Sequence, residues 1–143
     1  MPDSVPPDSF VLDASVVAKL HFAEAGSELA EAVTLRAERL IAPDLIYAEM
    51  ASIAAKKVRR GVTSRDHAAV ALGSLRVLLD EAAPLAGLAD RAFDLAVAHG
   101  FSAYDGAYLA LAEMSGLAVL TADLRLARRA SDVGLGHLVH PLA

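Results

Sequence analysis

The sequence contains no cysteine, asparagine, glutamine or tryptophan. The absence of cysteine excludes disulfide bonds, thiolate zinc sites and cysteine nucleophiles, and it fits a protein of the reducing cytoplasm. Without Asn or Gln, no amide side chain is available to read the edge of an adenine base. The net charge of −5 argues against a protein that coats nucleic acid, although it leaves room for an enzyme that acts on nucleic acid through a local site.

Long hydrophobic segments are also absent. The longest stretch without Asp, Glu, Lys or Arg covers residues 133–143, whereas a membrane-spanning helix needs about 20 apolar residues. The first residues lack the basic and apolar segments of a signal peptide. We therefore expect no membrane segment, and the length of 143 residues indicates one ordinary domain.

Alanine and leucine dominate the composition, with 31 and 22 copies, which favours closely packed helices. Short apolar segments predict strands at residues 9–13, 40–42, 117–120 and 137–140. Helical patterns are expected at residues 14–22, 27–39, 45–60, 64–79, 89–99, 102–115 and 124–130, and residues 80–88 are expected to be irregular around Pro84. This alternation predicts an α/β fold with a mostly parallel sheet of four or five strands flanked by helices. Residues 1–8 are expected to form a flexible tail before a single domain at 9–143.

Four acidic residues are candidates for a functional site because of their places in this pattern. Asp13 ends the first predicted strand, and Asp123 follows the strand at 117–120. Since the carboxyl ends of parallel strands meet at one crevice, these two carboxylates are expected to lie together. Asp105 and Glu49 lie on helices that could border the same crevice.

Each aspartate also has a purely structural explanation. Asp13 and Asp123 precede predicted helices and could cap them, and Asp105 follows Ser102 at the spacing of a capping box. Taken singly, capping explains each aspartate better than catalysis does. Glu49 differs, because it lies on an apolar helix stripe, where a carboxylate must be paired, protonated or bound to a cation.

Several carboxylates in one crevice repel each other, and a divalent cation relieves this repulsion. A site with oxygen ligands and no thiolate favours Mg²⁺ or Mn²⁺. Such an ion binds phosphate oxygens, activates water and stabilises a leaving oxygen.

The segments that carry these acids resemble a known family. They are residues 11–19 (VLDASVVAK), 42–49 (APDLIYAE), 102–112 (SAYDGAYLALA) and 119–123 (VLTAD). Their order and spacing are similar to those of the PIN-domain ribonucleases, and within them to the VapC-type toxins of toxin–antitoxin pairs. The resemblance covers nearly the whole chain and implies a PIN-like three-layer sandwich.

The resemblance also implies roles for individual residues. It makes Asp13 and Asp105 direct metal ligands, with Asp123 completing the metal site directly or through water. Glu49 would orient a metal-bound water, so that all four acids are catalytic. Ser15 and Thr121 would support them by hydrogen bonds within the pocket. The family's first helix often carries a Trp after its Lys, and this chain has Leu20 there, a difference in packing.

The activity implied by the resemblance is hydrolysis of RNA phosphodiester bonds by an activated water, with Mg²⁺ or Mn²⁺ as the cofactor. The implied partners are a small antitoxin protein and a second copy of the chain in a homodimer. For RNA contact the candidates are Lys19, Arg125 and Arg128. A further basic cluster could follow RNA phosphates or form a solvated helix end, and the second interpretation is preferred; it comprises Lys56, Lys57, Arg59, Arg60 and Arg65.

Two alternatives remain open at this stage. One is a PIN-domain nuclease of housekeeping RNA processing, whose motif acids would be identical. The other is a non-catalytic protein-interaction module in which the acids serve as helix caps. An aspartyl phosphatase is disfavoured because Ser15 stands where its second acid belongs, and dinucleotide-binding or P-loop folds are excluded because no Gly-rich loop follows a strand.

Overall fold

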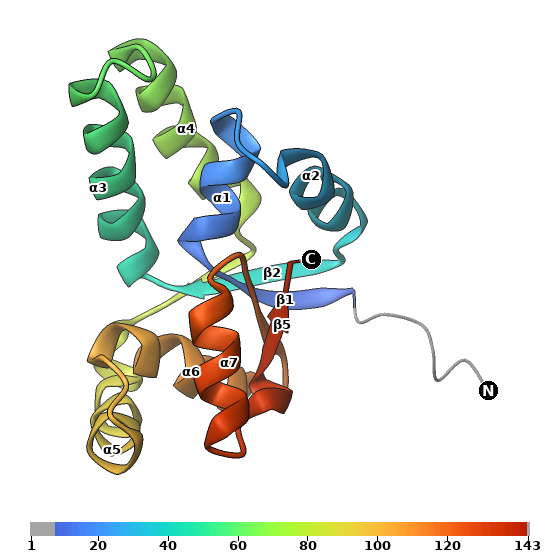
Figure 1. Cartoon of the computed structure of the whole chain (residues 1–143), viewed down its shortest axis with the longest axis vertical. Helices are drawn as coiled ribbons and strands as arrows, with labels where there is room; N and C mark the ends of the chain where they lie inside the picture. Colours follow the sequence, from blue (N-terminus) through green and yellow to red (C-terminus); the bar gives the residue numbers. More distant parts are fainter. Residues whose placement is uncertain (1–7, 143) are drawn as a thin grey trace.

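The computed structural model describes residues 8–142 and contains a five-stranded parallel sheet in the order β3-β2-β1-β4-β5 (Figure 1). The strands are β1 (Ser9–Leu12), β2 (Arg39–Pro43), β3 (Glu81–Ala83), β4 (Ala118–Thr121) and β5 (Val139–Pro141). This architecture confirms the predicted α/β fold. The expected tail at residues 1–8 lies outside the described residues except for Asp8, whose carbonyl accepts a hydrogen bond from the Glu38 N–H at 2.5 Å.

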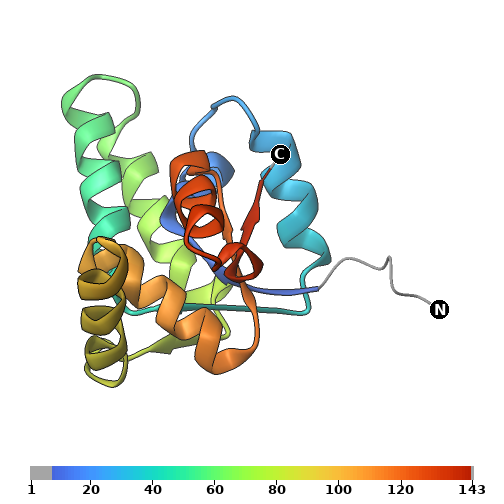
Figure 2. The ribbon, with the colours of Figure 1, turned by 60° about the horizontal axis from the view of Figure 1, so that its bottom comes forward.

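Helices cover both faces of the sheet (Figures 1 and 2). One face packs against α1 (Ala14–His21), α2 (Ser27–Arg36), α3 (Leu45–Arg59) and α4 (Arg65–Leu78). The other packs against α5 (Ala89–His99), α6 (Ala103–Ser115) and α7 (Leu124–Asp132), with the short 3-10 helices η1 (Leu85–Gly87) and η2 (Gly136–Leu138). Among the described residues, no helix is both long and apolar enough to cross a membrane.

Successive strand residues point to opposite faces and build two separate cores. In β1, Val11 joins the core beneath α5, α6 and α7, whereas Leu12 joins the core beneath α1, α3 and α4. Leu120 of β4 faces the same way as Leu12. Because both faces of the sheet are covered, the central strands β1, β2 and β4 are largely apolar, which explains why they were detectable in the sequence.

The path of the chain creates a topological switch point between β1 and β4. From β1 the chain moves outward through β2 to β3, and it then returns to place β4 on the other side of β1. The N–H of Asp13 donates to the carbonyl of Leu120 at 3.1 Å, which holds the two strand ends together. In open α/β sheets, ligands bind in the crevice outside the strand ends at such a point.

Residues 80–88 differ from the sequence prediction, which made them irregular. They contain the edge strand β3, in which Ala82 pairs with Ala42 of β2, followed by η1. The side chains of this strand are small or charged, so no apolar run marks it. Its pairing is helped by Asp80, whose carboxylate accepts a hydrogen bond from the Leu40 N–H at 2.8 Å.

Helix α6 lies unusually close to α5, and a glycine allows this. A Cβ atom at Gly106 would stand 2.8 Å from the carbonyl oxygen of Ala92, which is closer than real Cβ contacts. The neighbouring Asp105 is thereby carried on a helix whose position is set by backbone contact rather than by adjustable side chains.

Candidate active site

Four carboxylates surround one open pocket at the carboxyl edge of the sheet. The pocket has a volume of about 340 Å³ and is lined by Asp13, Ala14, Ser15, Glu49, Ser52, Ile53, Asp105 and Asp123. The four acids come from four places in the fold: the end of β1, the middle of α3, the first turn of α6 and the residue after the β4 loop. The structure therefore brings the four predicted acids around one pocket.

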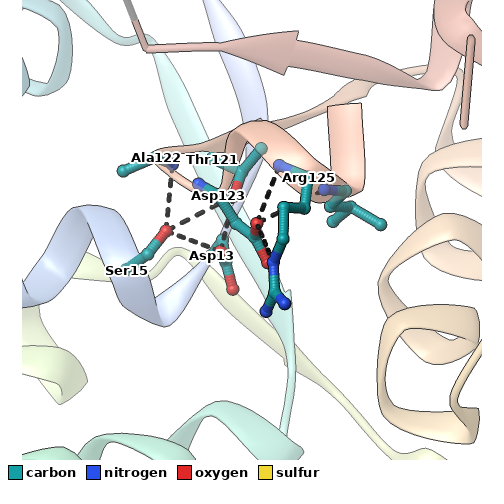
Figure 3. Close-up of polar contacts among 7 residues, drawn as sticks. Asp13, Ser15, Thr121, Ala122, Asp123 and Arg125 are labelled. Carbon is teal, nitrogen blue, oxygen red and sulfur yellow. Dashed lines mark hydrogen bonds and ion pairs between the residues drawn. The ribbon is translucent and has the colours of Figure 1, made fainter. Parts of the chain in front are cut away.

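Asp13 is held by two hydroxyl groups (Figure 3). Its Oδ2 accepts hydrogen bonds from Ser15 Oγ at 2.6 Å and from Thr121 Oγ1 at 2.7 Å. Among the described residues, no side-chain hydrogen bond is directed to the other oxygen, Oδ1. One oxygen thus fixes the carboxylate, and the second remains free for a ligand.

The same hydroxyls tie the two central strand ends together. Thr121 is completely buried, and its Oγ1 accepts the N–H of Asp123 at 2.9 Å. Ser15 Oγ accepts the N–H of Ala122 at 3.0 Å. The hydroxyls of residues 15 and 121 therefore set the relative positions of Asp13 and Asp123, as Figure 3 shows.

Helix capping accounts for only part of the acidic set. Asp13 occupies the N-cap position of α1, yet its side chain makes no capping hydrogen bond there. Asp123 does cap α7, because its Oδ1 accepts the N–H groups of Arg125 at 3.0 Å and Leu126 at 3.3 Å. At α6 the cap is Ser102, which accepts the N–H of Asp105 at 3.0 Å.

The N-termini of α1, α6 and α7 meet at the pocket, because Asp13, Asp105 and Asp123 lie at or near the starts of these helices. The partial positive charge at a helix N-terminus stabilises nearby carboxylates. This arrangement offsets part of the repulsion among the aspartates.

Glu49 has a partner that the sequence reasoning did not find. The hydroxyl of Tyr108 donates to Glu49 Oε1 at 2.6 Å. Tyr108 is only 2% exposed, and burial followed by the nearby carboxylates raises the pKa of its phenol, which stays neutral and donates. Its position one turn after Asp105, on a helix predicted to border the acids, was the available signal.

The carboxylates also affect each other electrostatically. Burial, then the charges of Asp123 and Asp13, raise the pKa of Asp105, while Ser102 and Arg129 lower it in part. Burial likewise raises the pKa of Glu49; the Tyr108 hydrogen bond opposes this, and Asp13 and Asp105 add to it. The pocket thus concentrates negative charge that is unfavourable without a counter-ion.

We expect Asp105→Asn to stabilise the metal-free protein at neutral pH. The pKa of the Asp105 carboxyl is raised in the folded state, so the folded protein binds a proton there more readily than the unfolded chain does. Ionised Asp105 therefore lowers the free energy of unfolding at any pH above the raised pKa. This loss disappears as the pH falls below the ordinary pKa of 3.8. The gain should be at most about 1 kcal/mol, because the carboxyl is half exposed and solvent screens the repulsion. Urea unfolding in EDTA measures it. An equal gain at neutral and acidic pH would contradict the electrostatic explanation.

The donor set fits a hard divalent cation. Every ionisable side chain that lines the pocket is a carboxylate, and one oxygen of Asp13 accepts no side-chain hydrogen bond from the described residues. Within residues 8–142, no group of three or more His, Asp or Glu side chains stands close enough to form a ready-made ion site. The acids therefore surround the pocket without converging on one point.

The three basic residues predicted to contact RNA differ in their contacts and in whether they approach the acids. Lys19 is on α1, where its Nζ donates to the carbonyl of Ala25 at 2.5 Å. The Arg125 side chain is 89% exposed, with its Nε 4.0 Å from Asp123 Oδ1. Arg128 is exposed on α7 and does not line the acidic pocket. Arg129 donates to the carbonyl of Gly100 at 2.9 Å and lies over the Phe101 ring at 5.0 Å.

Comparison with known proteins gives consistent results. The PIN-domain family matches residues 10–132. Ribonuclease VapC3 of Pyrobaculum aerophilum is 38% identical over 121 residues, covering 83% of this chain and 92% of that protein. VapC ribonuclease Mb0985 of Mycobacterium bovis is 37% identical over 100 residues, covering 70% of this chain and 74% of the relative. The crystal structure of PAE2754 from P. aerophilum superimposes with a TM-score of 0.69 at 22% identity, over 94% of this chain and 89% of that one, and supports the fold.

Proposed function

The chain belongs to the PIN-domain family, and from this membership we propose that it is an endoribonuclease, the toxin of a VapC-type toxin–antitoxin pair. The observation that carries the proposal is the pocket shared by Asp13, Glu49, Asp105 and Asp123 at the switch point between β1 and β4. The names of the two relatives support RNA as the substrate.

PIN-domain ribonucleases depend on metal ions in general, and the oxygen ligands here favour Mg²⁺ or Mn²⁺. Asp13, Asp105 and Asp123 would hold the cation. When bound, the ion supplies positive charge against the phosphate oxygens and makes a water more acidic.

The chain's own residues account for the remaining requirements of hydrolysis. The Ser15 and Thr121 hydroxyls fix one oxygen of Asp13 and leave the other directed to the ligand. Glu49 is anchored through one oxygen by Tyr108 and accepts a hydrogen bond from the attacking water with the other. Water attacks phosphorus and gives up a proton, the bond to the leaving strand's oxygen breaks, and that oxygen takes up a proton, so that one water is consumed for each bond cleaved. No side-chain nucleophile is required, which agrees with a chain without cysteine.

The relatives' names also bear on partners and location. We propose that the chain pairs with a small VapB-type antitoxin, that it forms a homodimer, and that it acts on RNA in the cytoplasm. Exposed apolar side chains on the helices, such as Val70 and Val77 of α4 and Phe93 and Val97 of α5, are consistent with protein partners.

The test is incubation of the purified protein with total RNA in Mg²⁺, in Mn²⁺ or in EDTA, followed by mapping of the new RNA ends. We expect cleavage at a restricted set of sites with either cation and none in EDTA. Equal cleavage in EDTA would reject the metal-dependent reaction. Absence of cleavage in every buffer would favour the non-catalytic interaction module.

A further inference from the structure

A second pocket, rich in basic residues, adjoins the acidic one. Its volume is about 380 Å³, and it is lined by Ser15, Ala18, Lys19, Glu24, Ile53, Lys56, Lys57, Arg60, Ala122 and Asp123. Three of these residues, Ser15, Ile53 and Asp123, also line the acidic pocket. The two pockets therefore share a wall, and a polymer bound in one can continue into the other.

Positive charge prevails in this second pocket, which we call the basic pocket. Four of its side chains are cationic: Lys19 from α1, Lys56 and Lys57 from α3, and Arg60 at the end of α3. Two acids offset part of this charge. Glu24 Oε2 lies 3.8 Å from Lys57 Nζ, and Asp123 lines the wall that the two pockets share.

Two of the four cations have no salt bridge in the described part of the chain. Lys56 and Arg60 are exposed, and no carboxylate of the described residues lies within ion-pair distance of either. The other two are partly engaged, since Lys19 bonds the Ala25 carbonyl, and Lys57 pairs with Glu24 and lies over the Phe22 ring at 5.3 Å. Lys56 and Arg60 are thus the most available groups for an anion.

The structure divides the basic cluster that the sequence showed as one. Arg59 and Arg65 do not line the basic pocket; they border a mostly apolar groove between α3 and α4. The chain has a net charge of −5, so four cations gathered beside the acids are a local feature rather than a property of the whole surface. A helix C-terminus attracts basic residues, but that preference alone does not explain why Lys19 of α1 faces the same space.

We propose that the basic pocket is a phosphate-binding subsite that holds the RNA backbone next to the cleaved bond. The proposal rests on the proposed nuclease function and extends it to Lys19, Lys56, Lys57 and Arg60. A phosphodiester placed among four carboxylates is repelled until a cation is bound, and neighbouring phosphates on cationic side chains compensate for that repulsion. Such contacts follow the backbone and read no base, which suits a chain without Asn or Gln.

The experiment compares two double variants of the same charge. Lys56→Ala with Arg60→Ala removes two cations from the basic pocket, and Arg59→Ala with Arg65→Ala removes two from the other groove. The affinity for a fluorescein-labelled single-stranded RNA of about 12 nucleotides is measured by fluorescence anisotropy in EDTA, at several salt concentrations. Urea unfolding checks that all proteins are folded, and Lys56→Arg with Arg60→Lys tests rescue by conserved charge.

We expect the dissociation constant of the pocket variant to rise about five- to tenfold, and its salt dependence to become shallower by about 0.7 per lost phosphate contact. The matched variant should stay within about twofold of the wild type, and the conservative variant should recover binding. Equal weakening by both double variants, or none by the pocket variant, would overturn the subsite. Weaker binding of an oligoglutamate peptide with unchanged RNA affinity would overturn it in favour of an acidic protein partner.

Cleavage of total RNA by the wild type in Mg²⁺ or Mn²⁺ is measured in parallel. If the wild type does not cleave, the nuclease proposal fails, whatever the binding data show. If it cleaves and the pocket variant binds and cleaves as the wild type does, only the subsite fails.

Discussion

Asp13→Asn should lower the rate of RNA cleavage by about a thousandfold or more, because it removes a negative charge from the metal site proposed at the switch point. The amide oxygen of Asn can still accept the hydroxyl hydrogen bonds of Ser15 and Thr121, so the fold should survive. Single-turnover cleavage rates at saturating Mn²⁺ measure the effect, and circular dichroism checks folding.

The matched control for this substitution is Asp90→Asn. Asp90 lies in the first turn of α5, exposed and outside the acidic pocket, so the change removes the same charge from a comparable helix position. It should leave the cleavage rate within about twofold of the wild type. If Asp13→Asn and Asp90→Asn gave the same rate, Asp13 could not be a ligand of the catalytic ion.

Thr121→Val is expected to have the second largest effect. It keeps the shape of a completely buried side chain but removes a hydroxyl that donates to Asp13 and accepts from the N–H of Asp123. Loss of such a support lowers metal affinity or activity by about 10- to 100-fold. The partly buried Asp123 N–H left without its partner costs a further ~1 kcal/mol in the free energy of unfolding.

The decisive measurement is the Mn²⁺ concentration that gives half-maximal cleavage. It should rise in Thr121→Val and return close to the wild-type value in Thr121→Ser, which restores the hydroxyl. Loss of stability with an unchanged Mn²⁺ requirement would mean that Thr121 supports the core and not the metal ligands.

Much of the fold could be predicted from short-range patterns. Both faces of the sheet are covered, so β1, β2 and β4 are almost wholly apolar and easy to detect. Edge strand β3 was missed, because its Glu-Ala-Ala sequence has neither an apolar run nor β-branched residues. Helix α2 ends at Arg36, three residues before the expected end, because Arg39 begins β2.

The grouping of the acids was predictable for a different reason. Residues that closely follow two parallel strands lie at the same edge of the sheet, so the grouping of Asp13 and Asp123 could be predicted from the strand pattern. Glu49 was identified because a carboxylate on an apolar stripe needs a partner. That the partner is Tyr108 depends on how α3 and α6 pack, which no local pattern specifies.

The basic residues show the limit of sequence reasoning most clearly. Neighbours in sequence such as Arg59 and Arg60 lie in different pockets, while Lys19 and Lys56, far apart in sequence, line the same one. A helix turns by about 100° at each residue, so a run of basic residues is necessarily divided between faces. Which face borders the acids is decided by tertiary packing alone.

The strand order has a consequence for the synthesis of the protein. The strand beside β1 in the sheet, β4, and the acid that follows it are translated more than a hundred residues after Asp13. Until Thr121 has been made and placed beside β1, one of the two hydroxyls that orient Asp13 is missing. The four acids can therefore share one pocket only after Asp123 has been translated, so a chain that ends before β4 holds an incomplete acidic site.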